Sequence, residues 1–299
     1  MKTQVKKVVS NRAIKPKGFL MKIRSRHPSH DSIRGKIRMP FPSVVRFGST
    51  TVMSEKVPNM VECNTPEAIQ NSSSKLRMKN CFTNANVKTA DWWIKNLTGN
   101  GFIQKIHNKN NHVVINNSEM PFPIVAKSHF GSRGKGNTLL HNLQELETFI
   151  STHSSTLNNY IFERFYNYNR EYRLHVDSDG CFYTCRKMLK EDTPKDQRWF
   201  RNDSNSVWIV EENEKFDKPN SWNDIVADCV KALKAVGLDF GACDVRVQST
   251  NEENGNRRKY CDYIVIEINS APSFGEITKT KYLEQLPIIL NKKYSSIKK

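Results

Sequence analysis

The C-terminal part of the chain holds three oxygen-bearing side chains whose spacing could bind a cation: Asp244, Glu267 and Asn269. Glu267 and Asn269 are two residues apart, so they project from the same face of a strand. Two carboxylates and an amide oxygen on one face suit a hard cation such as Mg²⁺. A solvated polar face on an amphipathic hairpin is the alternative. Glu267 argues against it, because this acid stands among aliphatic residues, where an unpaired charge is costly.

Two apolar segments must position these side chains, residues 242–247 and residues 263–269. Both are typical of β-strands, and the dipeptide Asn254-Gly255 between them is a strong hairpin signal. The register that such a hairpin imposes brings Asp244 and Glu267 close together. The sequence therefore predicts an antiparallel strand pair with a cation site on one face.

A lysine and a glycine-rich basic loop form a second group. The apolar residues 122–128 predict a strand that carries Lys127 near its end, and residues 129–136 follow as a loop with three glycines. Glycines allow backbone N–H groups to approach an anion closely, and Lys127, Arg133 and Lys135 add positive charge, so this loop suits a polyphosphate. It is not a Walker A loop, because no Gly-Lys-Ser/Thr opens a helix. An ordinary exposed hairpin is the alternative.

Two further acids stand at predicted strand ends. Glu163 closes the strand predicted over residues 160–165, and Glu171 opens the strand predicted over residues 170–176. Acids at such positions can accept hydrogen bonds from an adenine amino group or from ribose hydroxyls. Ordinary surface charges are the alternative reading for both residues.

Positive charge is concentrated at the N-terminus. The net charge is +17, and the first fifty residues contain thirteen lysines and arginines against the single acid Asp31. A basic segment of this kind attracts polyanions through counterion release, which makes nucleic acid a candidate partner. A solubilising, partly disordered terminus is the alternative, and no known nucleic-acid-binding motif is present.

Composition limits the remaining classes. The 299 residues can form one to three domains. No apolar run of about 18 residues occurs, and the basic start lacks an apolar secretory core, so we expect no membrane partner. The seven cysteines are scattered without a CxxC pair, which predicts reduced thiols in a cytoplasmic protein.

In order and spacing, these short motifs resemble the ATP-grasp superfamily between about Ser72 and Leu286. The sequence is most similar to D-alanine–D-alanine ligases and to the glutamate-adding ligases related to the enzyme that modifies a ribosomal protein. Its Val-Arg-Phe-Gly-Ser-Thr and Glu-Ile-Asn-Ser-Ala-Pro segments are similar to small ATP-grasp proteins of tailed bacteriophages. The resemblance implies an α+β fold in which two α+β subdomains clamp ATP. It implies a basic N-terminal region over residues 1–70, a central subdomain over 71–165 and a C-terminal subdomain over 166–299.

The resemblance also assigns site residues. The family's cofactors are ATP and Mg²⁺ or Mn²⁺, and the metal ligands would be Asp244, Glu267 and Asn269. Glu171 would bind the ribose. The other nucleotide-binding features would be two phosphate lysines, a mobile loop, an adenine hinge and a basic strand end. The lysines correspond to Lys75 and Lys127, and the loop to Gly131, Ser132, Arg133, Gly134 and Gly136. The hinge corresponds to Glu163, Arg164 and Phe165, and the basic strand end to Arg186 and Lys187.

Three residues would take part in catalysis by resemblance. Arg201 and Asn202 are similar to an Arg-Asn loop that faces an acyl phosphate in the glutamate-ligase branch, with a plain basic surface loop as the alternative. Ala242 stands where D-alanine–D-alanine ligases have an arginine, and Arg246 on the same strand face could substitute for it. The short N-terminal region also departs from the family, so the substrate site is not assigned.

The activity implied is ATP-dependent joining of a carboxylate to an amine or related nucleophile through an acyl phosphate, with release of ADP and phosphate. The substrates would be small-molecule, peptide or protein carboxylates and amines. A small-molecule kinase on the same fold is one alternative. A nucleic-acid-binding protein with a regulatory or lost nucleotide site is the other.

Overall fold

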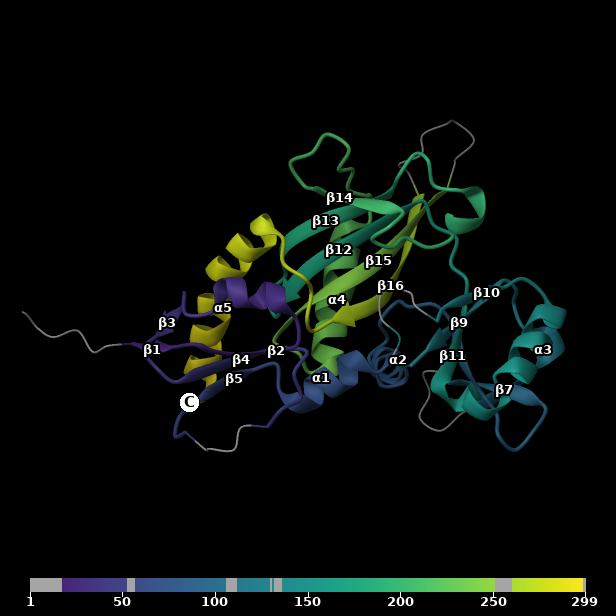
Figure 1. The fold of residues 1–299 in the computed structure, drawn as a ribbon, viewed down its shortest axis with the longest axis horizontal. Coiled ribbons are helices and arrows are strands. Elements are labelled where there is room, and N and C mark those ends of the chain that lie inside the picture. The colour runs from purple at the N-terminus through teal and green to yellow at the C-terminus, as the bar shows by residue number, and fades with distance from the viewer. Residues whose placement is uncertain are drawn as a thin grey trace, which may run out of the picture.

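The computed structural model describes residues 18–52, 57–105, 112–129, 131, 136–250 and 260–297. These residues form sheets of six, five, three and two strands together with five α-helices (Figure 1). The expected α+β class is confirmed. None of the described helices is both long and apolar enough to cross a membrane. The six cysteines with described side chains are free thiols.

The N-terminal part forms a small parallel sheet in the order β2-β4-β5. Its elements are β1 (Phe19–Leu20), β2 (Lys22–Ser25), the 3₁₀ helix η1 (Pro28–Ile33), β3 (Arg38–Met39), β4 (Ser43–Phe47) and β5 (Val61–Cys63), with β1 paired to β3. The last helix of the chain, α5 (Glu276–Ile297), packs on this part. Phe47, Tyr282 and Leu286 are fully buried in the shared core. The small N-terminal sheet and the last helix therefore fold as one unit.

The middle of the chain forms an antiparallel six-stranded sheet in the order β10-β9-β11-β6-β7-β8, on the right of Figure 1. Its elements are β6 (Trp92–Lys95), β7 (Gly101–Lys105), β8 (His112–Asn116), η2 (Asn117–Glu119), β9 (Ile124–Ser128), β10 (Thr138–Leu140), α3 (Leu143–Thr152), η3 (Ser154–Asn159) and β11 (Tyr160–Arg164). Phe102, Phe149 and Phe162 meet edge to face in its core. β9 and β11 are neighbours, so Lys127 and Glu163 lie on adjacent strands.

A third sheet is antiparallel, with five strands in the order β14-β13-β12-β15-β16. Its elements are β12 (Arg170–Asp177), β13 (Cys181–Leu189), η4 (Lys195–Gln197), β14 (Ser206–Val210), β15 (Phe240–Thr250) and β16 (Tyr260–Asn269). Alternate residues such as Tyr172, Val245 and Val265 point into one core with three helices. These helices are α1 (Pro66–Ser73), α2 (Lys75–Asn84) and α4 (Trp222–Val236). The opposite face of the sheet carries polar residues such as Arg173 and Asp244.

Helices α1 and α2 begin where the sequence provides caps. The Thr65 hydroxyl accepts a hydrogen bond from the Ala68 N–H, and Ser74 does the same for Arg77. Met78 and Phe82 of α2 pack in the core of the five-stranded sheet. The hydrophobic clusters thus group α1 and α2 with the C-terminal sheet, although residues 71–165 were expected in one subdomain. The three-part division of the chain stays a prediction.

Truncating the shared core of α5 tests this arrangement. We expect Leu286→Ala to lower the free energy of unfolding by about 2–5 kcal/mol, because Leu286 is fully buried. Ile288 of the same helix is 54% exposed, so Ile288→Ala is the matched control. It should change the free energy of unfolding by less than about 0.5 kcal/mol. Urea denaturation of both variants makes the comparison, and equal effects would contradict the packing of α5.

Candidate functional site

The two predicted C-terminal strands are paired as the hairpin pattern indicated. β15 and β16 run antiparallel, with Asp244 opposite Glu267 and Ala242 opposite Asn269. The Asn269 side-chain amide donates to Asp244 Oδ2 and to Glu267 Oε1, both at 3.3 Å. Two carboxylates and one amide therefore converge on the polar face of the sheet. The turn at Asn254-Gly255 lies outside the described residues.

Arg173 of β12 supplies positive charge to this group. Its guanidinium donates to both oxygens of Asp244, Nε to Oδ1 at 2.7 Å and Nη2 to Oδ2 at 2.9 Å. Burial would raise the pKa of Asp244, but the Arg173 charge outweighs burial and lowers it. Sequence reasoning did not single out Arg173. Its position two residues after Glu171 was the available signal, because residues two apart share a strand face.

A second charged cluster lies where β9, β11 and α2 meet. Glu163 is 4% exposed and accepts from Lys127 Nζ at 2.7 Å, while Lys79 Nζ lies 3.4 Å from its other oxygen. Burial would raise the pKa of Glu163, but the two lysines lower it to about 2. Burial lowers the pKa of Lys79 to about 8. Both oxygens of Glu163 are thus paired with lysines.

Lys79 was also missed by the sequence prediction. It lies one helical turn after Lys75 on α2, and this spacing places the two lysines on the same side of the helix. Lys75 Nζ donates to the Gly131 carbonyl at 2.5 Å, at the start of the glycine-rich loop. Burial lowers the pKa of Lys75, and the charge of Glu267 opposes this shift. Lys75 therefore interacts with both the loop and the carboxylate group.

The glycine-rich loop is described only in part. Gly131 and Gly136 belong to the described residues, and Gly136 has a φ of +76°, a conformation that favours glycine. The expected phosphate-binding residues Ser132, Arg133 and Gly134 lie outside the described residues.

A tyrosine between two arginines forms a third group on the polar face. The guanidinium carbons of Arg246 and Arg201 lie 4.1 Å and 4.8 Å from the centre of the Tyr168 ring. Arg246 Nε also lies 3.4 Å from Glu171 Oε2. Lys187 Nζ donates to the Arg201 carbonyl at 2.9 Å. The structure thus brings the predicted residues Arg201, Arg246, Glu171 and Lys187 together.

Arg186 does not join this group. It alternates with Lys187 along β13, so its side chain lies on the opposite face of the sheet, where Nη1 donates to the Lys215 carbonyl at 2.6 Å. The two basic residues predicted to bind the nucleotide therefore lie on opposite faces of the sheet, and nucleotide binding by Arg186 stays a prediction. Strand alternation is the physical reason, because adjacent residues in a strand point to opposite faces.

Asn202 has a local structural role. Its side-chain oxygen accepts hydrogen bonds from the backbone N–H groups of Ser204 and Asn205, at 2.8 and 3.0 Å. Such bonds stabilise a turn. The oxygen of Asn202 is therefore already engaged in shaping its own loop.

The predicted adenine hinge after β11 is also engaged. The Arg164 side chain is exposed near Asp91, and the Arg164 N–H donates to the Asp91 carbonyl at 2.9 Å. The Phe165 N–H donates to the Pro123 carbonyl at 2.9 Å. Both N–H groups of this segment hold it against neighbouring loops, so an adenine ring would have to use other groups of the hinge.

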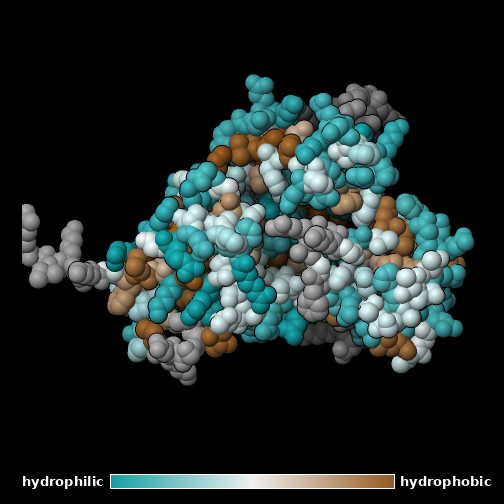
Figure 2. All heavy atoms as spheres, in the orientation of Figure 1, coloured by the Kyte–Doolittle hydropathy of each residue, from teal (hydrophilic) through white to brown (hydrophobic). Residues whose placement is uncertain are grey.

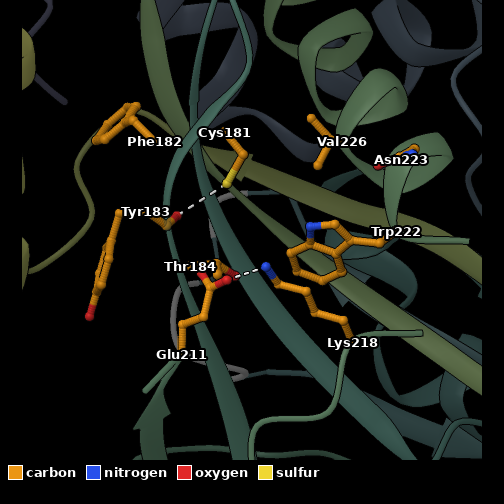
Figure 3. A pocket seen from close by; sticks show the side chains of 9 residues that line it. All are labelled: Cys181, Phe182, Tyr183, Thr184, Glu211, Lys218, Trp222, Asn223 and Val226. Carbon is orange, nitrogen blue, oxygen red and sulfur yellow. Dashed lines mark hydrogen bonds and ion pairs between the residues drawn. The ribbon is translucent and has the colours of Figure 1, made fainter. Parts of the chain in front are cut away.

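A cavity of about 360 Å³, which none of these residues lines, lies beside β13 and the start of α4 (Figure 3). Trp222 forms one wall, and an ion pair of Lys218 with Glu211 crosses the front. The Cys181 thiol donates to the Tyr183 carbonyl, and burial raises its pKa to about 12. A neutral thiol is a weak nucleophile. None of the residues that line the cavity is among the predicted site residues.

The buried Glu163 cluster predicts a pH dependence of stability. A carboxyl whose folded pKa is about 2, against an ordinary value of 4.5, stabilises the fold above about pH 5 and loses this effect as the pH falls toward 2. We expect Glu163→Gln to be less stable than the natural chain by roughly 3 kcal/mol at pH 7, with a gap that closes near pH 2. Denaturant unfolding at several pH values measures the gap. The exposed Glu147→Gln is the control, and a gap independent of pH for Glu163→Gln would contradict the assignment.

Comparison with known proteins supports a fold assignment. No known family profile and no curated protein sequence matches the chain. Among solved structures, the D-alanine–D-alanine ligase of Bacillus anthracis complexed with ATP is similar, with a TM-score of 0.55 and 11% identity over 85% of this chain and 79% of that chain. The D-alanine–D-alanine ligase of Coxiella burnetii has a TM-score of 0.52 and 11% identity, over 88% of this chain and 69% of that chain. The biotin carboxylase of Campylobacter jejuni has a TM-score of 0.53 and 15% identity, over 83% of this chain and 54% of that chain. The chain therefore has the ATP-grasp fold, as its short motifs predicted.

Proposed function

We propose that this protein is an ATP-dependent ligase that joins a carboxylate to an amine or related nucleophile through an acyl phosphate and releases ADP and phosphate. The observation that carries the proposal is the convergence of Asp244, Glu267 and Asn269 on one sheet face, next to a cluster of buried lysines. Alternating positive and negative groups of this kind suit a nucleoside triphosphate bound with a divalent ion.

Electrostatic effects connect the charged clusters into one site. The charge of Glu267 raises the pKa values of Lys75 and Lys79 against the effect of burial. The charge of Glu163 acts in the same way on Arg246. The interaction of Glu163 with Arg246 crosses from the six-stranded sheet to the five-stranded sheet, so a ligand held by both would lie between them.

The carboxylate group fits a divalent ion. Asp244 and Glu267 are close together and Arg173 is their partner of opposite charge, so an added cation would reduce the remaining repulsion. The donors are oxygens only, provided that Asn269 presents its carbonyl oxygen, and such a set suits Mg²⁺ or Mn²⁺. When bound, the ion would supply charge neutralisation and Lewis acidity at phosphate oxygens.

The lysines would hold the phosphates. Lys75 Nζ bonds to the Gly131 carbonyl of the glycine-rich loop, and Lys127 Nζ bonds to Glu163. These two contacts fix the direction of both side chains. Residues from Gly131 to Gly136, including those outside the described part, would cover the phosphates. Glu171 would accept hydrogen bonds from the ribose, and residues Glu163, Arg164 and Phe165 would flank the adenine. Glu163 would act mainly through Lys127, because its carboxylate pairs with lysines.

The arginines would stabilise the charge that develops during transfer. A substrate carboxylate attacks the γ-phosphate, ADP leaves, and the acyl phosphate is then captured by an amine with release of phosphate. Arg246 and Arg201 are fixed by Tyr168, and Lys187 adjoins them, so their positive charges are positioned in advance. The Cys185 thiol, which is near Lys187, does not compete as a nucleophile, because burial raises its pKa to about 12.

Nucleic-acid binding by the basic N-terminal region stays a separate prediction. Residues 1–17 lie outside the described part. Some of the charge beyond them is structural, because Arg46 is fully buried and pairs with Glu62, and Arg34 pairs with Asp31 at 2.7 Å. Charges used within the fold add little to the attraction of a polyanion. A steep loss of affinity with salt would be the sign of such binding.

Asp244→Asn tests the proposed ligase directly. We expect ADP formation to fall by ~100-fold or more, because even the loss of an outer partner of a metal ligand costs about 10–100-fold. The measurement is ADP release from ATP and Mg²⁺ with a panel of amino acids and peptides as carboxylates and amines. ADP formation that needs no amine acceptor would instead favour a kinase, and unchanged turnover in Asp244→Asn would refute the site.

A neighbouring pair on β13 gives a matched test of the site face. We expect Lys187→Gln to weaken ATP binding by roughly 10-fold or more, as the loss of one charged hydrogen bond would. Arg186→Gln removes the same charge one residue away, on the other face, and should leave ATP affinity within about twofold. Calorimetric titration of both variants makes the comparison. Equal losses would mean that net charge, and not the site, governs binding.

A further inference from the structure

Lys79 is a charged residue in an unusual place. Lysines usually stay at the surface, and hydrophilic residues cover much of the face of the molecule in Figure 2. Lys79, in contrast, is fully buried. It belongs to α2, in which the Lys75 N–H donates to the His129 carbonyl just after β9 while Met78 packs in the core of the five-stranded sheet. Lys79 is therefore held at the boundary between the two large sheets (Figure 1).

Two contacts fix the ammonium group of Lys79. Its Nζ donates to the Thr89 hydroxyl at 2.5 Å and lies 3.4 Å from Glu163 Oε1. Lys127 Nζ donates to the other oxygen of this carboxylate, Oε2, at 2.7 Å. Within the described part of the chain, no second acid lies within ion-pair distance of either lysine. Glu163 is thus shared by two lysines, and Lys127 is the closer of the two.

Lys127 would have two anionic partners. In the proposed function its ammonium group binds a phosphate of ATP, whereas in the structure it is bonded to Glu163. If Lys127 were the sole partner of Glu163, its departure would leave a carboxylate that is 4% exposed without an opposite charge, which is costly. Lys79 removes this cost, because it remains beside Glu163 when Lys127 moves.

The lysines around Glu163 also repel one another. Burial lowers the pKa values of Lys75 and Lys79, and the charge of Lys127 lowers them further, while Glu163 and Glu267 oppose the shift. A further anion would relieve this repulsion. Lys75 and Lys127 keep some exposed surface and could reach such an anion, whereas Lys79 is fully enclosed. The position of Lys79 therefore suits a fixed partner of Glu163 and not a ligand of the phosphates.

We propose that Lys79 is a positioning residue, which neutralises Glu163 so that Lys127 can move its ammonium group from Glu163 to a phosphate of the bound nucleotide. The inference rests on the proposed binding of ATP and adds an exchange of contacts to it. Lys127 changes its partner, and Lys79 does not. Only hydrogen bonds and ion pairs change in this exchange, and no covalent bond forms or breaks.

A double-mutant cycle on ATP affinity tests this role. Lys79→Met removes the charge and keeps an unbranched side chain, so Lys127 becomes the sole counter-ion of Glu163. We expect ATP with Mg²⁺ to bind about 10-fold more weakly, as the loss of one charged hydrogen bond would produce. In the Glu163→Gln background the same substitution should change the affinity by less than about twofold, because a neutral amide needs no counter-ion. Calorimetric titration measures all four chains.

Other roles for Lys79 predict a different cycle. A packing role, or a direct contact with the nucleotide, predicts the same loss of ATP affinity in both backgrounds, and this result would overturn the proposal. Arg77→Met is the matched control, because Arg77 is exposed on the same helix and bonds to Gln70. It should leave ATP affinity within about twofold, as expected for an exposed charge that salt screens. Equal losses in Arg77→Met and Lys79→Met would reduce the effect to net charge and overturn the proposal as well.

A crystal of the natural chain with Mg²⁺ and a non-hydrolysable ATP analogue gives a second measurement, which does not depend on whether a variant folds. We expect Lys127 Nζ within about 3 Å of a phosphate oxygen, and Glu163 within the same distance of Lys79 Nζ. Lys127 still bonded to Glu163 and away from the phosphates would overturn the proposal. Lys79 bonded to a phosphate would overturn it too.

The outcomes separate this inference from the proposed function. A natural chain that binds no ATP would refute the proposed function and this inference with it. A natural chain that binds ATP, with Lys79→Met binding it equally well, would refute only the role of Lys79. ATP bound with the partner of Lys127 exchanged, but without ADP formation from any carboxylate and amine, would support the exchange and refute the ligase.

Discussion

The site depends on the antiparallel pairing of β15 with β16. This register sets Asp244 opposite Glu267 and keeps both on the polar face, while Val245 and Val265 point into the core. A slip of β16 by one residue would turn Glu267 toward the apolar core, away from Asp244. Two acids held together repel each other, and Arg173 and Asn269 offset this repulsion. Core packing and the polar group thus require the same register.

Helix α2 links the two large sheets. Met78 and Phe82 anchor it in the core of the five-stranded sheet, whereas Lys75 and Lys79 point toward the loop and Glu163 of the six-stranded sheet. Burying two lysines would be costly without a partner, and the ionised Glu163 provides it. The helix therefore carries positive charge to the boundary between the sheets while its apolar side fixes its position.

Sequence reasoning worked best where a local pattern determines the result. Strand alternation and one turn dipeptide predicted Asp244 near Glu267, and an irregularity in the strand pairing between Asp244 and Val245, which the sequence did not indicate, places the two directly opposite. The same rule, applied to β13, would have separated Arg186 from Lys187, and applied to β12 it would have joined Arg173 to Glu171. The pairing of Glu163 with Lys79 could not be predicted in this way, because it joins a helix and a strand 84 residues apart in the chain.

The central claim is that Asp244, Glu267 and Asn269 bind a divalent ion beside a triphosphate. The most direct measurement is the anomalous scattering of Mn²⁺ in crystals grown with the ion and a non-hydrolysable ATP analogue. We expect one strong peak in contact with oxygens of Asp244 and Glu267 and with the analogue's phosphates. A Mn²⁺ peak elsewhere would contradict the claim. The absence of any peak, with Arg173 still bonded to both oxygens of Asp244, would contradict it as well.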